Sequence, residues 1–342
     1  MKIAIIGVTG FGGSSPLGKA LIKMLEARGH DLQVFYYNDI PASFKVHKVF
    51  ARFGGKSPME RYVQYIAHTI REEKPNMLIA IEGGDILLEG LPKDTKKVFL
   101  PQAPMSSEAY FTWASSKEPF DIKRFYDLKD KEIAMYEAAD MIFYAWKTYE
   151  EYVRKYVYDS PKIISHPKYG WFGCEPQDKL VQYQYPTSIV FLGNLGYYWM
   201  NKELLSHLTA VSPYVIDVWG APKPDEHYKL RYKGIAPTHD VLYDYQFGLV
   251  TVSKDLVRQW GWSSKILTYL SHGLPCLFPE WHRCGHELGG CIPYNEANFN
   301  EVVDSYIDRA VWEEKSQEAI EQARELSWPK ILSPMIEILE SS

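Results

Sequence analysis

The strongest constraint on the fold is an alternation of apolar strands and amphipathic helices that runs through the chain twice. The first strand is expected in "KIAIIG" (2–7) and the next in "DLQVFYY" (31–37). A helix is expected between them over about 16–28, with Ser15 as its cap and Pro16 in its first turn. A strand, a helix and a strand in this order form a unit with parallel strands, so the series predicts a doubly wound α/β domain.

The same alternation continues to about residue 172 and then starts again. We expect further helices over 59–73, 131–140 and 149–157, and strands over 76–85, 96–101, 141–146 and 162–167. In the second series we expect strands over 185–196, 214–220, 274–279 and 291–294, a helix over 201–211, and a short helix and a strand within 240–252. The stretch 172–186 contains Gly173, Pro176 and Pro186 and is the natural linker. Two Rossmann-like, doubly wound α/β domains are therefore predicted, over 1–172 and from 186 onward.

Two domains of this kind also predict where ligands bind. An open parallel sheet binds its ligand outside the carboxyl ends of its strands. If both sheets face one central cleft, each domain can hold one of two substrates.

Composition narrows the class of protein. The 342 residues are more than a single core usually supports, and the net charge of −5 disfavours nucleic acid as the main partner. No apolar leader precedes the strand at Lys2, and no apolar run reaches the ~18–20 residues that cross a bilayer. The four cysteines are expected to be free thiols, so a cytoplasmic location is predicted.

The glycine-rich loop "GVTGFGGSS" (7–15) follows the first strand. Gly7, Gly10 and Gly13 have the spacing of a dinucleotide-binding fingerprint, and the loop resembles the start of extended short-chain dehydrogenases. That resemblance would imply an NAD-dependent epimerase or reductase. Two other interpretations stay open: a tight turn, or a loop in which Gly12 and Gly13 lie near a donor or acceptor held by the opposite domain.

Two observations oppose the dehydrogenase interpretation. The helix starts at Pro16, later than the fingerprint requires. The family also needs a tyrosine and a lysine four residues apart on one helix. The best match is Tyr158 and Lys162, but the intervening Ser160-Pro161 disfavours a helix there.

The second series contains a short helix with an unusual first turn, in "WGWSSKILTYLSHGLPCLFP" (260–279). Ser263 or Ser264 can cap it, Lys265 lies in its first turn, and Gly273 ends it. A lysine there opposes the helix dipole and costs stability unless an anion is bound. Free backbone N–H groups, hydroxyls and an ammonium together suit a diphosphate. The alternative is an ordinary surface lysine.

This segment resembles the donor-binding segment of GT-B glycosyltransferases, in which a helix that carries a lysine ends in Gly-x-Pro before a strand. Other stretches follow in that family's order, among them "MKIAIIG", "YEAADMIFYAWKTYEEY", "IVFLGNLG" and "YKGIAPTHDVLYDYQFGLVTV". The resemblance covers nearly the whole chain and is closest to bacterial exopolysaccharide glucuronosyltransferases. It implies an acceptor-side domain over 1–172, a donor domain over 186–320, and a closing helix over 321–342 that crosses back to the first domain.

The resemblance assigns donor-binding residues. It implies that Lys265, Ser263 and Ser264 hold the diphosphate, with amides near Gly193 and Asn194. The base and ribose would lie along 233–236, which includes Gly234 and Ile235, and Arg283 would approach the phosphates. Thr268 stands where many relatives carry a glutamate that contacts the donor, so the donor sugar and the stereochemical class stay open. No metal and no cofactor are implied, because the nucleoside-diphosphate sugar is a co-substrate.

An inverting enzyme also needs a group that takes the proton of the acceptor hydroxyl. Glu82 and Asp85 in "IEGGD" follow a predicted strand, and we prefer Asp85, although it could equally cap the next helix. Glu108 is a second candidate, with a capping arrangement as its alternative.

Two further stretches have alternative interpretations. His282, Cys284, His286 and Cys291 are residue types that bind zinc, but their spacing is not that of a finger or ribbon, so a loop at the ligand site is preferred. The segment 109–130 mixes aromatic and basic residues and could touch a membrane surface, or be a solvated loop.

The sequence thus predicts a metal-independent glycosyltransferase that moves a sugar from a UDP-sugar to a glycan or lipid-linked acceptor, in the cytoplasm or at the inner membrane surface. The alternatives are a phage-type glycosyltransferase acting on DNA bases and an NAD-dependent epimerase or reductase.

Overall fold

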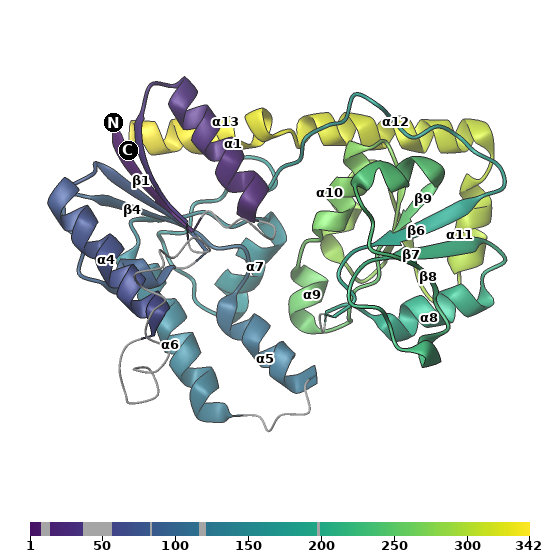
Figure 1. Ribbon diagram of the computed structural model, residues 1–342, viewed down its shortest axis with the longest axis horizontal. Helices are drawn as coiled ribbons and strands as arrows, with labels where there is room; N and C mark the ends of the chain where they lie inside the picture. The colour runs from purple at the N-terminus through teal and green to yellow at the C-terminus, as the bar shows by residue number, and fades with distance from the viewer. Residues whose placement is uncertain (8–13, 37–56, 83, 116–120, 197–198) are drawn as a thin grey trace. The chain divides into compact units, whose positions relative to one another are not determined.

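A computed structural model describes residues 1–7, 14–36, 57–82, 84–115, 121–196 and 199–342. The chain divides into two compact units (Figure 1). The first comprises the described parts of 1–106 and 121–172 together with 331–342, and the second those of 107–120 and 173–330. Each unit contains one parallel sheet with helices, which confirms the prediction of two Rossmann-like α/β domains.

The sheet of the first unit has the strand order β2-β1-β3-β4-β5, and all its strands are parallel. Its elements are β1 (Lys2–Ile6), α1 (Ser14–Ala27), β2 (Asp31–Phe35), α4 (Pro58–Glu73), β3 (Met77–Ile81), the 3-10 helix η2 (Gly84–Leu88), β4 (Lys96–Leu100), α5 (Met105–Ser115, continuing into the second unit), α6 (Ile122–Ala138), β5 (Met141–Ile142) and α7 (Lys147–Tyr156). Every residue of β3 is buried, as expected for the central strand of a covered sheet. A capping box between Ser57 and Glu60 fixes the start of α4.

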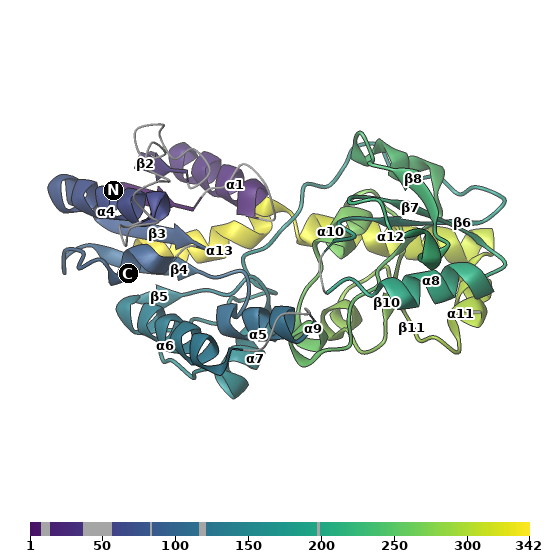
Figure 2. The ribbon, with the colours of Figure 1, turned by 60° about the horizontal axis from the view of Figure 1, so that its bottom comes forward.

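The sheet of the second unit has the order β11-β10-β9-β6-β7-β8 and is also parallel. Its elements are β6 (Ser188–Leu192), α8 (Lys202–Val211), β7 (Val215–Trp219), η3 (Glu226–Tyr228), β8 (Arg231–Gly234), η4 (His239–Asp244), β9 (Phe247–Leu249), α9 (Leu256–Trp260), α10 (Ser264–Ser271), β10 (Cys276–Pro279), η5 (Arg283–Glu287), β11 (Cys291–Tyr294), α11 (Phe299–Tyr306) and α12 (Arg309–Glu325). Helices α10 and α12 lie side by side (Figure 2), and the Ser316 hydroxyl of α12 donates to the Gly273 carbonyl that follows α10, at 2.6 Å.

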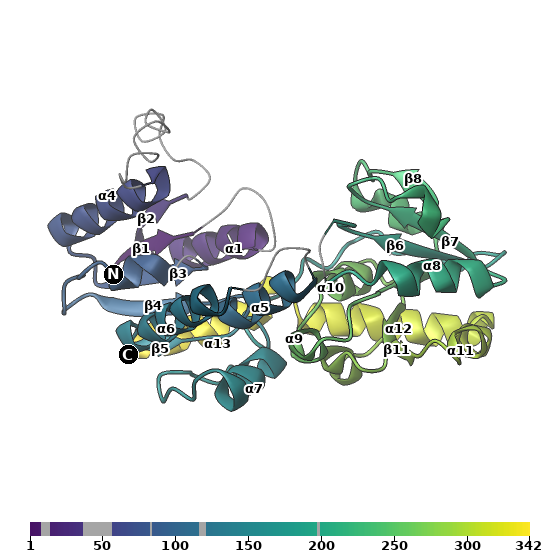
Figure 3. The ribbon, with the colours of Figure 1, turned by 90° about the horizontal axis from the view of Figure 1, so that it is seen from below.

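Several stretches differ from the expected secondary structure. Most of 109–130, for which a solvated loop was one interpretation, is helical in α5 and α6. The strand expected over 162–167 is only a single bridge between Ile142 and Ile163. The Ile163 carbonyl accepts a hydrogen bond from the Arg154 guanidinium at 2.7 Å. Strand β8, at the edge of the second sheet (Figure 3), was not expected. Its residues alternate between exposed and half-buried, so it lacks the apolar run that indicates a buried strand.

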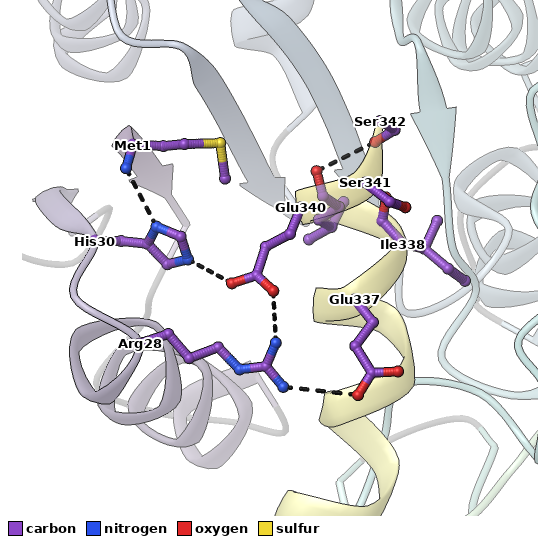
Figure 4. A network of polar contacts seen from close by, with 9 residues as sticks. Met1, Arg28, His30, Glu337, Ile338, Glu340, Ser341 and Ser342 are labelled. Carbon is purple, nitrogen blue, oxygen red and sulfur yellow. Dashed lines mark hydrogen bonds and ion pairs between the residues drawn. The ribbon is translucent and has the colours of Figure 1, made fainter.

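A charged cluster holds the last helix, α13 (Trp328–Ser341), against the first unit (Figure 4). The Arg28 guanidinium lies 2.6 Å from the Glu340 carboxylate and 3.9 Å from that of Glu337. The His30 ring donates from Nε2 to Glu340 at 2.8 Å, while its Nδ1 lies 3.4 Å from the amino group of Met1. The hydrogen bond from His30 and the charge of Arg28 hold the pKa of Glu340 below its usual value.

We predict that Glu340→Gln lowers the free energy of unfolding by about 0.5 kcal/mol at pH 7, the range of partly exposed ion pairs. Because the folded-state pKa of Glu340 is lowered, its stabilisation is present above pH ~4.3 and is lost as the pH falls through the folded pKa. Urea unfolding at pH 7 and at pH 3 should therefore show a difference between wild type and variant that shrinks in acid. Glu313→Gln, in the exposed pair with Arg309, is the control and should change little. An equal difference at both pH values would contradict this assignment.

Candidate functional site

A pocket of about 350 Å³ lies at the carboxyl ends of strands β6 and β7 and beside the chain that follows β8. Among the predicted donor-binding residues, Gly193, Asn194 and Ile235 line it, and Gly234 directly precedes Ile235. The remaining lining residues are Leu192, Gly220, Ala221, Ala236, Pro237, Thr238 and His239. The pocket therefore brings together the two chain segments that the sequence analysis assigned to a nucleotide.

The inner side of the pocket is built from backbone in close contact. Gly220 has a φ of 156°, and a Cβ at this position would collide with the Gly193 carbonyl oxygen. The Gly193 amide donates to the Trp219 carbonyl at 3.0 Å, and the Gly220 amide to the Gly234 carbonyl at 2.9 Å. The Gly193 amide was predicted to bind the diphosphate, but it donates its hydrogen bond to the neighbouring strand instead.

Lys265 of helix α10 lies directly against Gly193. A Cβ on Gly193 would collide with Cε of Lys265, so any larger residue there would displace the lysine side chain from its present position. The Lys265 ammonium lies 5.3 Å from the centroid of the Phe191 ring. Among the described residues, no carboxylate lies within ion-pair distance of it. The pocket thus has an uncompensated positive charge beside it.

The environment of Lys265 lowers its pKa to about 8, first because burial disfavours the charged form and second because the positive charge of Arg258 is near. The same causes, burial followed by the charge of Arg258, lower the pKa of the buried His282 to about 3, with smaller effects from His286 and Lys265. His282 is therefore neutral at physiological pH. A bound anion would relieve the repulsion in this region.

The two serines before Lys265 leave the start of α10 open. Ser263 occupies the cap position and is nearly buried, but its side chain makes no capping hydrogen bond. Ser264 begins the helix and is exposed, and the Thr268 hydroxyl donates to its carbonyl at 3.0 Å. The Ile266 amide donates to the Ser263 carbonyl at 3.0 Å, so the first-turn N–H groups without a side-chain cap are those of Ser264 and Lys265.

The loop after β10 carries an exposed cation, Arg283. The Arg283 guanidinium stacks 3.6 Å from the centroid of the Trp260 ring, and the side chain is exposed. His286 contacts the Glu280 carbonyl at 2.6 Å, whereas His282 contacts the thiol of Cys284. In the part of the chain that the structure describes, no three side chains of the metal-ligating types converge.

In the first unit, Glu82 and Asp85 follow β3 at the point where the strand order reverses. Chain connections leave β1 and β3 in opposite directions there, which is where open sheets bind ligands. Glu82 has a φ of 56°, in the left-handed region that disfavours residues other than glycine. Asp85 instead forms an ion pair with Lys131 at 2.8 Å. Such strain is concentrated at functional sites, so Glu82 is the stronger candidate of the two.

Among the described residues, the remaining predicted site residues do not line the pocket. Glu108 forms an ion pair with Arg258 of α9, which stacks 4.7 Å from the centroid of Trp199. Gly12 and Gly13 lie outside the described residues.

Gly220 and His239 line the pocket but were not predicted from the sequence. The turn expected after "YVIDVWG" was a signal for Gly220.

We predict that Lys265→Met makes the protein more stable than wild type near pH 7. The folded-state pKa of Lys265, about 8, lies below the unfolded value of ~10.4, so its charge is a cost to the ligand-free fold below pH 8. That cost disappears as the pH rises from about 8 to about 10, and the advantage of the variant should shrink in parallel. Urea unfolding at pH 7 and pH 9.5 measures this. Lys330→Met is the control, and a variant less stable than wild type at pH 7 would contradict the prediction.

Comparison of sequences identifies no relative: no protein-family model and no curated protein matches the chain. Solved structures do match it. The lipopolysaccharide outer core galactosyltransferase WaaB, in its apo form, is 13% identical with a TM-score of 0.65, over 100% of this chain and 99% of WaaB. AviGT4, a glycosyltransferase involved in avilamycin A biosynthesis, is 13% identical with a TM-score of 0.59, over 100% and 99%.

The same fold is found in a UDP-GlcNAc 2-epimerase from Methanocaldococcus jannaschii, solved with UDP-GlcNAc and UDP. It is 12% identical with a TM-score of 0.52, over 100% of both chains. In the GtfA/B complex, this chain covers 61% of the longer chain that it matches, at 16% identity and a TM-score of 0.55. At these identities the likeness concerns the fold: the chain has the GT-B fold of these proteins.

Proposed function

We propose that this protein is a glycosyltransferase that takes a sugar from a UDP-sugar and transfers it to a glycan or lipid-linked acceptor. The observation that carries the proposal is the Lys265 ammonium. It has no carboxylate partner among the described residues, and it lies beside the uncapped start of α10 and against Gly193 of the pocket. A diphosphate would supply the negative charge that this arrangement lacks.

The pocket supports a nucleoside in addition to the diphosphate. Its volume suits a small ligand. Ile235 is 71% exposed, and an exposed apolar side chain at a pocket rim can pack on the flat face of a base. We assign the base and ribose to the segment from Gly234 to His239 and the diphosphate to Lys265, Ser264 and Asn194.

UDP is proposed as the nucleotide because the M. jannaschii protein with a similar fold was solved with UDP-GlcNAc and UDP. Since that protein is an epimerase, UDP binding by itself would not identify a transferase. The product separates the two activities: a transferase releases UDP and lengthens an acceptor, whereas an epimerase returns an altered UDP-sugar.

We assign the proton transfer to Glu82. In an inverting reaction, a carboxylate takes the proton of the acceptor hydroxyl as its oxygen attacks the anomeric carbon, and UDP leaves. Lys265 would stabilise the negative charge that develops on the leaving diphosphate. Asp85, which forms an ion pair with Lys131, is the second candidate, and Glu82 is preferred for its left-handed backbone conformation.

The acceptor is proposed from the sequence resemblance to bacterial exopolysaccharide glucuronosyltransferases, which implies a growing glycan. In the described chain, no helix combines the length and the apolarity that a bilayer crossing requires. A peripheral contact with a lipid-linked acceptor is supported by helix α6, on which Ile122 and Tyr126 are each 55% exposed. No described feature favours the alternatives, a DNA acceptor or an NAD cofactor.

We predict that UDP raises the melting temperature of the wild-type protein and that Lys265→Met removes this shift. A ligand stabilises the folded state by RT ln(1 + [L]/Kd), so UDP at about 100 times its Kd gives about 2.7 kcal/mol. Thermal unfolding with UDP, GDP, NAD and no ligand measures the effect, and Lys330→Met should respond like wild type. A full UDP shift in the Lys265 variant would refute the assignment of the donor site.

We further predict that Glu82→Gln retains the UDP-dependent thermal shift and lowers the rate of sugar transfer about 100-fold or more, as loss of a general base does. The release of UDP from a panel of UDP-sugars with a glycan acceptor measures the rate. Asp85→Asn is the matched comparison and should have a smaller effect, because the proton transfer is assigned to Glu82 and not to Asp85. Wild-type rates in the Glu82 variant would move the catalytic role elsewhere.

A further inference from the structure

The hydroxyl of Tyr269 lies between two strands of the second sheet, where their backbone pairing stops. Strands β6 and β9 pair through Ile189 with Phe247 and Val190 with Gly248. Beyond these pairs, the Leu192 amide donates to the Tyr269 hydroxyl at 2.9 Å, and the hydroxyl donates to the Leu249 carbonyl at 3.2 Å. The Tyr269 hydroxyl thus bridges a backbone N–H of one strand and a backbone carbonyl of the other, in place of a direct hydrogen bond between the strands.

The surrounding chain is shaped to this side chain. Tyr269 is fully buried, and a Cβ on residue 248 would collide with its ring, so Gly248 is what allows the ring to enter. A hydroxyl that both accepts from one strand and donates to the other leaves no unsatisfied group in the gap. Where the backbone pairing of β6 and β9 ends, the two strands are therefore connected through the Tyr269 side chain of α10.

Tyr269 is connected to the diphosphate site in two ways. It lies four residues after Lys265, so the two side chains project from the same face of α10. Its hydroxyl fixes Leu192, and the next residue is Gly193, against which the Lys265 side chain packs. Both Leu192 and Gly193 line the pocket. The Tyr269 hydroxyl thus connects the end of β6 to the helix that carries Lys265.

We propose that Tyr269 is a positioning residue of the donor site: its hydroxyl holds the end of β6 at the distance from α10 at which the pocket and Lys265 form one binding surface. This inference rests on the proposed function for the identity of the ligand. The geometric part concerns Lys265 and can be tested without any ligand.

The test compares Tyr269→Phe with Tyr294→Phe. Tyr294 is a matched control, because it is also fully buried in the same sheet and also donates to a backbone carbonyl, that of Val250 directly after β9, at 2.8 Å. It lies on β11, at the opposite edge from β8, and accepts no backbone amide from β6. Both variants lose one buried hydroxyl, so a general loss of stability should be similar in the two.

Calorimetric titration with UDP gives the first readout. We expect Kd to rise about tenfold or more in Tyr269→Phe, as for other residues that orient a binding group, and to change less than about twofold in Tyr294→Phe. If both variants bind UDP like wild type, or weaken equally, the positioning role is overturned.

The second readout needs no ligand. Acylation of Lys265 with acetic anhydride, followed by mass spectrometry across pH, reports where its amine loses the proton. In Tyr269→Phe the midpoint should move away from the wild-type value, and in Tyr294→Phe it should stay. If wild type binds no UDP, the proposed function fails, but a shifted midpoint still supports the positioning role, and an unshifted one overturns it.

If Tyr269→Phe does not fold, amide hydrogen exchange in the wild-type protein tests the proposal instead. The Leu192 amide should be protected before UDP is added, because its acceptor is a side chain already in place. Free exchange of that amide would overturn the proposal.

Discussion

The site depends on one interaction, the packing of the Lys265 side chain against Gly193 without a carboxylate among the described residues to balance its charge. Burial and the neighbouring Arg258 lower its pKa to about 8, so the ligand-free fold keeps the ammonium at an energetic cost. A structural lysine would be expected either to reach solvent or to pair. A cation that is partly buried and not paired is typical of a site that is completed by an anion.

The rest of the second unit can be understood as support for that lysine. The glycines at 193 and 220 let the ends of β6 and β7 come together, so that backbone forms the inner side of the pocket. Helix α10 carries Lys265 and Tyr269 on one face, and α12 packs beside it. The same short helix thus supplies both the charge beside the pocket and the hydroxyl that lies between β6 and β9.

Much of the fold could be predicted from the sequence, because parallel strands buried on both faces are short apolar runs and helices between them have caps. β3 and α4 are found within a few residues of their expected limits. Strand β8 could not be predicted in this way, since an edge strand with residues such as Arg231 and Lys233 has no apolar run. The stretch 162–167 was expected to be a strand, but only Ile163 makes a bridge.

In the candidate site, too, some features could be predicted from the local sequence and others could not. The first-turn lysine and the glycine turns at 193 and 234 are local signals, and the pocket lies beside them. Contacts between distant residues leave no such signal. The Asp85–Lys131 pair, the use of the Gly193 amide by Trp219 and the Tyr269 hydroxyl each depend on how separate segments pack. Tyr269 in particular has the spacing of an apolar helix position, so its polar atom could not be assigned a role before the fold was known.

The central claim is that Lys265 receives the diphosphate, and proton uptake on binding tests it most directly. At pH 8.5, an amine with a pKa of about 8 is mostly neutral, and a bound diphosphate would restore its charge. Calorimetry of UDP binding in two buffers of different ionisation enthalpy should therefore show uptake of about three quarters of a proton by wild type and almost none by Lys265→Met. Tight binding of UDP to wild type without proton uptake would contradict the account.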